Sequence, residues 1–336
     1  MIVLTDKQEA GERSLYASED YGKAVAAADG GSWLELRDGD GEWCIPLIAR
    51  PISNSLMSDA VTPYGYGGVH VGDGLSSTDV SRLWGESRRV LSEAGIVSLF
   101  LRFPPFIPTQ ANRLAGLPGL EVTPVSQTFV VPLADGADMW AAMHKRGRNA
   151  VRTAEKNACR AEIVAIEEAN LRDTRELYEQ TMHRVGAADH YFFPDEYYKA
   201  LMGLGDRIKV ARVIDARGEI VAASFILRDE QHAHYHLSGS TGSESGANNL
   251  MIWAVMQWAA DEGITALHLG GGVTVGDSLH RFKAAFGGKE ADFHVGKAIL
   301  QPEHYRQLVD RRAVEIGVDP IVLNSGTFFP AYRAAG

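Results

Sequence analysis

The alternation of apolar and polar positions predicts a β-rich first part of the chain. In residues 32–50, two alternating apolar runs flank an Asp-Gly-Asp-Gly turn, the pattern of a β-hairpin. Residues 77–95 begin with Ser and Thr, carry apolar residues at helical spacing and end at Gly95, so they predict a helix. A buried strand over 96–103, which ends before two prolines, and a further strand over 127–133 complete this part.

The second part begins with helices and then turns to strands. Helical spacing predicts helices over 138–157, 170–186 and 193–205. Three apolar runs joined by short turns predict an antiparallel meander over 207–215, 220–228 and 232–240. The remaining elements are a mostly apolar helix, a strand, a short helix and a last strand, over 248–263, 264–272, 278–284 and 293–300. The length of 336 residues favours two domains, which we place at 1–134 and 135–336.

The composition indicates an ordinary globular protein. Hydrophobic residues make up 45% of the chain and charged residues 23%, and no apolar run reaches the roughly 18 residues that span a bilayer. The N-terminus becomes polar and acidic at once, unlike a secretory signal. Cys44 and Cys159 are the two cysteines, too few for a disulfide framework or a zinc site. We therefore expect a cytoplasmic protein.

A net charge of −10 argues against a protein that coats nucleic acid, but the charge is unevenly distributed. Six of the residues from His144 to Arg160 are Lys or Arg, and Glu155 is the acidic one. Five of these cations recur along the predicted helix, namely Lys145, Arg146, Arg148, Arg152 and Lys156. They indicate either a solvated amphipathic helix or a surface that neutralises nucleic-acid phosphates.

A single lysine near the C-terminus is a candidate for chemistry. Lys283 follows Phe282 in a short predicted helix, and the strand before this helix ends in three glycines, 270–272. Glycines at a strand end indicate that another group approaches the backbone closely. The alternative is an ordinary surface lysine.

These motifs resemble the Fem-type aminoacyltransferases of the GNAT superfamily. The resemblance rests on Leu-Gly-Gly-Gly followed by residues 277–288, on the basic helix at 143–157, and on residues 235–240 before a long apolar helix. It covers roughly residues 30–300 and is closer in the second part. It implies an α/β fold of two tandem GNAT-like domains, each a mixed, mostly antiparallel sheet flanked by helices. It also implies transfer of an aminoacyl group from aminoacyl-tRNA to an amine.

The resemblance implies a catalytic role for Phe282 and Lys283. Acyl transfer passes through an oxyanion, which a buried ammonium stabilises, and Phe282 would contact the terminal adenine or exclude water, unless it is a core aromatic. His280 lies three residues earlier on the same helical face and is a candidate base, although the amine can lose its proton to substrate or water. Asp277 is expected to be the helix N-cap.

The usual CoA loop of GNAT enzymes is altered here. Gly239, Gly242 and Gly246 are present between the meander and the next helix, but Ser243 and Asn248 replace the Gln or Arg and the final small residue of that motif. The resemblance therefore favours aminoacyl-tRNA as the donor, without a bound cofactor, over acyl-CoA.

Aromatic and basic residues are candidates for binding the acceptor. Tyr64 and Tyr66 lie on a glycine-rich loop and Arg102 on the strand over 96–103, where they suit a polar or anionic acceptor, or form a packed loop with a structural ion pair. Tyr235 is a fourth candidate. His232, His234 and His236 share one strand face, but their spacing of about 7 Å is too wide for one zinc ion, so no metal is expected.

The sequence leaves three functions open. The first is an aminoacyltransferase acting on a peptidoglycan precursor or on an amine of antibiotic or other secondary-metabolite biosynthesis. The second is a GNAT N-acyltransferase that uses acyl-CoA. The third is a binding module on a decayed transferase fold, against which the intact Phe282–Lys283 pair counts.

Overall fold

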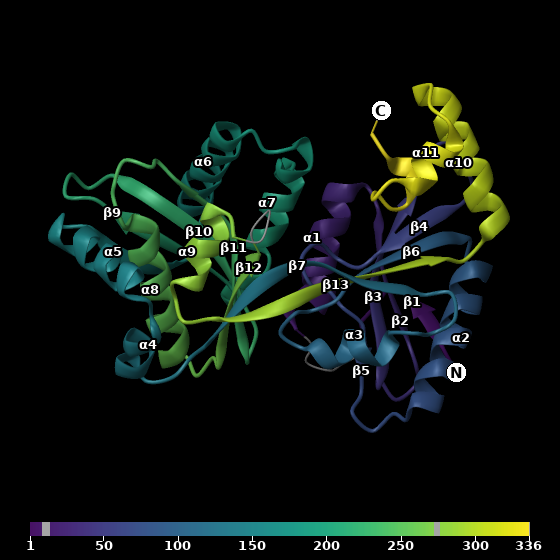
Figure 1. The fold of residues 1–336 in the computed structure, drawn as a ribbon, viewed down its shortest axis with the longest axis horizontal. Coiled ribbons are helices and arrows are strands. Elements are labelled where there is room, and N and C mark those ends of the chain that lie inside the picture. Colours follow the sequence, from purple (N-terminus) through teal and green to yellow (C-terminus); the bar gives the residue numbers. More distant parts are fainter. Residues whose placement is uncertain (9–13, 272–275, 336) are drawn as a thin grey trace. The chain divides into compact units, whose positions relative to one another are not determined.

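The computed structural model describes residues 1–8, 14–271 and 276–335. The chain folds into two compact units (Figure 1). Unit 1 comprises Met1–Val125 together with Phe293–Gly336, and unit 2 comprises Ser126–Asp292. The two unit boundaries fall inside strands β7 (Glu121–Pro132) and β13 (Lys289–Ile299), each of which contributes residues to both units.

Unit 1 is built on a mixed sheet in the order β1-β2-β3-β4-β6-β13, with β5 beside β3. Its other strands are β1 (Val3–Thr5), β2 (Ser32–Arg37), β3 (Trp43–Pro51), β4 (Ser58–Val61), β5 (His70–Val71) and β6 (Ile96–Arg102). The predicted hairpin is present, because β2 and β3 pair antiparallel from Ser32 opposite Ala49 to Arg37 opposite Cys44. β4 and β6 are parallel, and helix α2 (Ser77–Glu93) connects them.

Helices cover both faces of this sheet. Helix α2 and helix α3 (Pro108–Leu114) bury Leu83, Trp84 and Leu114 against one face. Helix α1 (Glu19–Asp29) packs on β2 and β3. Three C-terminal helices follow β13, namely α10 (Pro302–Ile316), α11 (Pro320–Ser325) and the short 3-10 helix η4 (Ala331–Arg333). They form a separate core cluster in which Tyr305 and Val309 meet Val97 of β6.

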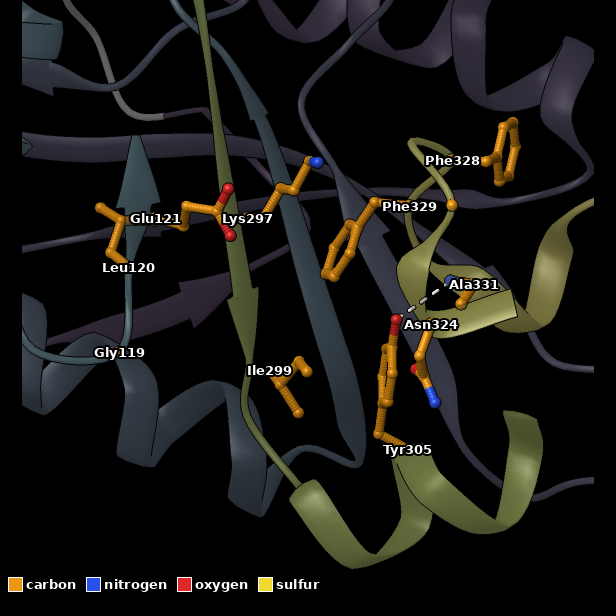
Figure 2. Close-up of a pocket in the computed structure, with 11 residues that line it drawn as sticks. Gly119, Leu120, Glu121, Lys297, Ile299, Tyr305, Asn324, Phe328, Phe329 and Ala331 are labelled. Carbon is orange, nitrogen blue, oxygen red and sulfur yellow. Dashed lines mark hydrogen bonds between the residues drawn. The ribbon is translucent and has the colours of Figure 1, made fainter. Parts of the chain in front are cut away.

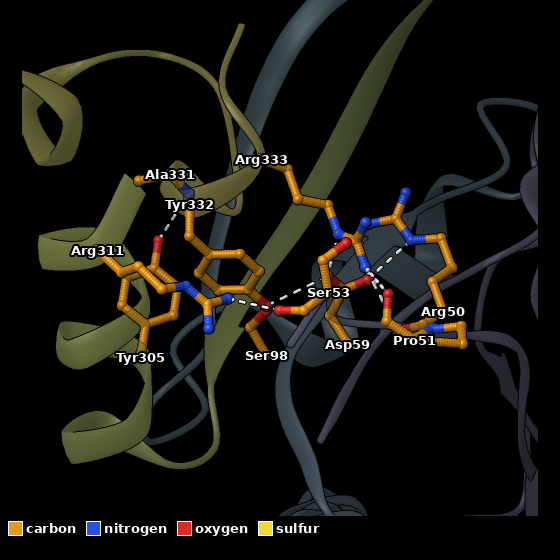
Figure 3. A network of polar contacts seen from close by, with 10 residues as sticks. All are labelled: Arg50, Pro51, Ser53, Asp59, Ser98, Tyr305, Arg311, Ala331, Tyr332 and Arg333. Carbon is orange, nitrogen blue, oxygen red and sulfur yellow. Dashed lines mark hydrogen bonds and ion pairs between the residues drawn. The ribbon is translucent and has the colours of Figure 1, made fainter. Parts of the chain in front are cut away.

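A buried carboxylate ties the end of the chain to unit 1 (Figure 3). Asp59 of β4 accepts a 2.7 Å hydrogen bond from Nε of Arg50 and a 3.2 Å hydrogen bond from the hydroxyl of Tyr332, and it pairs with Arg333. The Tyr332 hydroxyl also lies 2.8 Å from Oγ of Ser98. Because Asp59 is fully enclosed, these partners replace the water that its charge would otherwise hold.

Unit 2 has a sheet in the order β7-β12-β11-β10-β9-β8. These strands are β8 (Arg160–Ala165), β9 (Ile208–Ile214), β10 (Ile220–Arg228), β11 (His232–Ser240) and β12 (Ala266–Gly271), together with β7. Strands β9, β10 and β11 form the predicted antiparallel meander. β11 and β12 are parallel, and the buried helix α8 (Ala247–Asp261) connects them, so unit 2 repeats the strand–helix–strand arrangement of unit 1.

The helices of unit 2 lie on the two faces of its sheet. Helices α4 (Gly136–Ala142), α5 (Lys145–Lys156) and α8 build the main core on one face. Helix α6 (Glu168–Val185) packs on β10 and β11 from the other, with α7 (Asp195–Met202) beside it. The short 3-10 helix η2 (Asp189–Tyr191) precedes α7 in sequence and η3 (Gly205–Arg207) follows it, whereas η1 (Leu15–Ala17) belongs to unit 1. Helix α9 (Ser278–Ala284) contacts β12.

Two predictions differ from this architecture. The single helix expected over 138–157 is two helices, because Met143 is extended and α4 ends there. The compact units also differ from the domains placed at 1–134 and 135–336, since residues 293–336 group with unit 1. Strand β13 pairs antiparallel with β6 from Val295 to Ile299, and this pairing draws the C-terminal segment into that unit.

Candidate active site

Helix α9 holds the candidate catalytic lysine and begins with the expected cap. The carboxylate of Asp277 accepts a 2.6 Å hydrogen bond from the backbone N–H of His280, which confirms Asp277 as the N-cap. Gly270 and Gly271 end β12, whereas Gly272 and residues 273–275 of the glycine-rich stretch lie outside the described residues. The cap sets the direction of α9 and hence the position of Lys283.

Lys283 is a buried lysine and not a surface one. Its side chain is 6% exposed, and Nζ donates a 2.8 Å hydrogen bond to the carbonyl oxygen of Gly271. Burial lowers the pKa of Lys283 to about 8, and the charge of Asp277 opposes this shift. At neutral pH the lysine therefore remains mostly an ammonium, held by a backbone carbonyl in a poorly solvated place.

His280 is also buried, one helical turn before Lys283. Its ring lies edge-on to Phe129 with 4.8 Å between the centroids, and Nε2 lies 3.5 Å from a carboxylate oxygen of Glu290. The phenyl ring and the carboxylate are thus the neighbours of the imidazole. Its role as a base stays a prediction.

Phe282 points towards the core of unit 2. It is half-buried, packs against the core cluster and meets Phe286 edge-on, with 5.3 Å between the ring centroids. This is the position of a core aromatic, one of the two roles considered from the sequence. The part of the ring that stays exposed is the part that a substrate could contact.

His268 of β12 lies beside the histidines of β11 and was not predicted from the sequence. His234 on β11 pairs in register with His268 on β12, and their rings meet edge-on with 5.7 Å between the centroids. The pKa of His268 lies well below its usual value, first through burial, then through His234 and the charge of Lys283. In the part of the chain that the structure describes, no three His, Cys, Asp or Glu side chains are arranged to hold a metal ion.

His232 and His236 lie on the same face of β11 as His234, but their surroundings differ. His232 stacks on His234 with 6.2 Å between the ring centroids, and His236 shares a 2.7 Å hydrogen bond with the hydroxyl of Tyr197. Tyr235 points to the opposite face, where it packs against the main core, and burial raises its pKa to about 12. Its predicted part in acceptor binding stays a prediction.

The basic helix α5 is largely exposed, with one exception. Four of its five predicted cations are exposed, namely Lys145, Arg146, Arg152 and Lys156. Arg148 is half-buried and donates to the carbonyl oxygens of Ala141, at 3.0 Å, and of Met143, at the C-terminal end of α4. Arg148 is therefore a helix-capping residue, and the cationic surface consists of the other four.

This cationic surface begins beside α9. The backbone N–H of His144 donates a 2.9 Å hydrogen bond to the carbonyl oxygen of Ala285, just after α9 ends. Gly147 makes the close approach possible, because a Cβ there would lie 3.0 Å from the same oxygen. Lys283 and the exposed cations thus belong to two helices held directly against each other.

The loop at residues 240–248, which stands in place of the CoA-binding motif, makes its contacts within the chain. Gly246 has a φ of 84° at the start of α8, and a Cβ on it would lie 2.1 Å from the carbonyl oxygen of Ala150 in α5. The hydroxyls of Ser243 and Thr241 lie 2.6 Å apart, and the Asn248 amide donates a 3.3 Å hydrogen bond to Ser240. The glycine at 246 therefore serves helix packing as well as the turn.

Arg102 of unit 1 is held in a polar and aromatic setting. Its guanidinium donates a 3.0 Å hydrogen bond to the carbonyl oxygen of Thr62 and lies 4.9 Å from the ring centroid of Phe100. Burial lowers the pKa of Arg102 and Arg50 lowers it further, whereas Asp29 and then Tyr64 act in the opposite direction. The contacts of Arg102 are thus internal to unit 1, and its predicted part in acceptor binding stays a prediction.

The two loop tyrosines of unit 1 have structural contacts. The backbone carbonyl of Tyr64 accepts a 3.0 Å hydrogen bond from the hydroxyl of Tyr21. The ring of Tyr66 lies edge-on to Tyr16, with 5.5 Å between the centroids. Both are half-buried, so the packed-loop alternative describes their surroundings, and their binding role stays a prediction.

Comparison with known proteins identifies the fold. Residues 145–284, from the first residue of α5 to the last of α9, match the acetyltransferase (GNAT) domain. The structure of FemX has 14% identity, covers 85% of this chain and 92% of its own, and superposes with a TM-score of 0.67. The chain has the Fem-like tandem GNAT fold. The predicted fold class and the predicted resemblance are thereby confirmed.

Two further structures share this GNAT fold. L-PGS from Bacillus licheniformis is 13% identical, covers 87% of this chain and 94% of its own, and has a TM-score of 0.56. A tandem GNAT protein from the clavulanic acid biosynthesis pathway is 12% identical, covers 89% and 99% of the two chains, and has a TM-score of 0.50. A comparison with curated protein sequences finds no match. Among the described residues, no helix has the length and apolarity to cross a membrane.

Proposed function

We propose that this protein is an aminoacyltransferase that moves an aminoacyl group from aminoacyl-tRNA to an amine and forms an amide bond. The observation that carries the proposal is the direct contact between α9, which holds the buried Lys283, and α5, which carries the exposed cations. The fold shared with FemX supports it. The acceptor would be a peptidoglycan precursor or an amine of a secondary-metabolite pathway.

In this mechanism the acceptor amine attacks the ester carbonyl carbon of the aminoacyl-tRNA. A C–N bond forms, the C–O bond to the tRNA breaks, and the amine proton passes to the departing 3′ oxygen. The ammonium of Lys283 stabilises the oxyanion between these steps, a contribution on the order of 3–4 kcal/mol for one well-placed donor. His280 is the candidate that receives the amine proton, in competition with water and with the substrate itself.

The exposed cations of α5 would bind the acceptor stem. Lys145, Arg146, Arg152 and Lys156 present exposed positive charge, and phosphate neutralisation needs no particular base sequence. Arg152 also lies over the Trp140 ring, 5.3 Å from its centroid, which restricts its direction. The cations of α5 would therefore bind the aminoacyl-tRNA, and α9 would position its ester.

An acyl-CoA donor is the second candidate. The match of residues 145–284 to an acetyltransferase domain and the likeness to the clavulanic acid pathway protein favour it. Against it stands the loop before α8, where Ser243 and Asn248 replace the motif residues and hydrogen-bond locally.

A mass-spectrometric assay of amide product distinguishes the donors. Purified protein would be incubated with charged tRNAs, or separately with acyl-CoAs, and a panel of amines, with Lys283→Ala and the exposed control Lys289→Ala alongside. Product from charged tRNA alone, lost in Lys283→Ala and kept in Lys289→Ala, supports the proposal. Product from acyl-CoA alone would establish the second candidate in its place.

A further inference from the structure

Unit 1 contains a pocket beneath the C-terminal segment that the proposed transfer does not use. The pocket has a volume of about 660 Å³, within the range of roughly 300–1,000 Å³ that is usual for small-molecule sites. One wall is formed by the beginning of β7 and by β13, with Glu121, Lys297 and Ile299. The opposite wall is formed by the segment after β13, with Tyr305, Asn324 and Phe329 (Figure 2).

The strand wall carries one charge of each sign. Among the residues that the structure describes, neither Lys297 nor Glu121 forms an ion pair or a side-chain hydrogen bond. Strands β13 and β7 are neighbours in the sheet order, so the ammonium and the carboxylate lie on adjacent strands. A pocket that offers both charges suits a ligand that also carries both, because each ligand charge finds an opposite partner.

The opposite wall is aromatic and is held in place before any ligand arrives. Phe329 stacks on Tyr305 with 6.0 Å between the ring centroids, and the Tyr305 hydroxyl accepts a 3.0 Å hydrogen bond from the backbone N–H of Ala331. Phe328 lines the pocket with 56% of its surface exposed. Fixed aromatic surface of this kind binds an apolar or aromatic body at a low cost in conformational entropy.

We infer that this pocket binds a short peptide with free amino and carboxyl ends and an aromatic or large apolar side chain. Glu121 would hold the ammonium, Lys297 the carboxylate, and Phe328 and Phe329 the side chain. Nucleotides and other polyanions fit less well, because Glu121 repels them. Fatty acids also fit less well, because they carry no ammonium for Glu121 to pair with.

Isothermal titration calorimetry on the full chain tests this inference with three matched probes. These are the dipeptide Ala-Phe, its N-acetyl form, which lacks the ammonium, and its C-terminal amide, which lacks the carboxylate. We expect Ala-Phe to bind, and each blocked form to bind about tenfold more weakly, since one charge-assisted contact is lost. Phe328→Ala should weaken all three probes by a similar factor without lowering thermal stability, because Phe328 is exposed.

Two variants assign the charges. Lys297→Met should bind Ala-Phe no better than its amide, and Glu121→Gln should bind Ala-Phe no better than its N-acetyl form. The exposed lysine variant Lys289→Met is the control and should bind like the unchanged protein. Equal binding of all three probes, or no heat with Ala-Phe up to millimolar concentration, would overturn the inference. Lys283→Ala should bind Ala-Phe normally, so a failure of the proposed transfer activity would leave this result standing.

Discussion

The backbone N–H of His144 and the carbonyl oxygen of Ala285 lie 2.9 Å apart in a hydrogen bond. This contact joins the N-cap of the cationic helix α5 to the C-cap of α9, two residues beyond Lys283. A donor bound through its phosphates on α5 would therefore be positioned by the same part of the molecule that holds the ammonium. The first predictions below separate the contributions of these two helices.

Replacing Lys283 by Met should reduce activity without reducing stability. Loss of the ammonium is expected to lower kcat about 10²–10³-fold, the range for removal of one oxyanion donor. Stability at pH 7 should be unchanged or higher, because the variant no longer buries a charge. Steady-state kinetics and urea unfolding of the same preparations measure both. A variant that unfolds more easily while keeping its activity would contradict this role.

The lowered pKa of Lys283 predicts a specific pH dependence. The folded protein releases this proton near pH 8, whereas the unfolded chain keeps it to about pH 10.5. The unfolded state thus binds more protons in this window, so the stability of the protein relative to Lys283→Met should rise between pH 8 and pH 10.5, by at most about 3 kcal/mol. Activity should fall over the same range as the ammonium is lost. Urea unfolding and rates at several pH values test both, and parallel stability curves would rule out the shift.

The exposed cations of α5 should control donor binding. The triple variant Lys145→Gln, Arg146→Gln, Lys156→Gln is expected to raise KM for charged tRNA and to reduce the slope of log affinity against log salt by roughly 2–3, or 0.7–0.9 per lost phosphate contact. Fluorescence anisotropy with labelled tRNA measures this slope. A control with the same change in net charge is Arg82→Gln, Arg89→Gln, Arg172→Gln, whose side chains are exposed elsewhere. An equal effect of both triples would indicate general electrostatic attraction only.

Gly246 should be intolerant of any side chain. Gly246→Ala combines a positive φ with a Cβ placed 2.1 Å from the carbonyl oxygen of Ala150, so α5 and α8 must move apart. Gly242→Ala is the matched control, because its φ is 75° and nothing lies within 4 Å of the added atom. We expect Gly242→Ala to cost roughly 1–2 kcal/mol and Gly246→Ala clearly more, as measured by thermal unfolding. Equal losses would show that conformational strain alone operates.

The buried carboxylate of Asp59 should be a main anchor of the C-terminal segment. Asp59→Ala leaves Arg50 and Arg333 without their partner and is expected to destabilise the protein by about 3–5 kcal/mol. Asp310→Ala removes an exposed partner of Arg306 on α10 and should cost less than about 1 kcal/mol. Urea unfolding of the two variants compares them directly, and similar small losses would remove Asp59 from this role.

Much of the fold was predictable because it depends on local patterns. The hairpin of β2 and β3, helix α2 and the meander of unit 2 all follow from alternation, helical spacing and turn residues. The break between α4 and α5 was not predictable in this way, because the apolar pattern continues through Met143. The break is accompanied by the capping of α4 by Arg148 and by a hydrogen bond from His144 to Ala285, a residue distant in sequence.

The candidate site was predictable only in part. Lys283 was found through its neighbours in sequence, but its burial depends on the packing of α9 on β12. His268 was missed because the parallel register that places it opposite His234 is set by α8, and the spacing of residues in the sequence does not encode it. The charges of Glu121 and Lys297 are far apart in sequence and meet at one pocket only because β13 returns to unit 1.

The return of β13 to unit 1 has a consequence for synthesis on the ribosome. Strand β6 is complete by Arg102, yet its antiparallel neighbour, from Val295 to Ile299, emerges only after all of unit 2 has been translated. Unit 2 is continuous in sequence and can therefore complete its fold before unit 1 does. Until β13 is translated, the edge of the unit 1 sheet at β6 has no neighbouring strand. We therefore expect residues 1–125 of the nascent chain to bind chaperones, or to aggregate without them, before β13 has been translated.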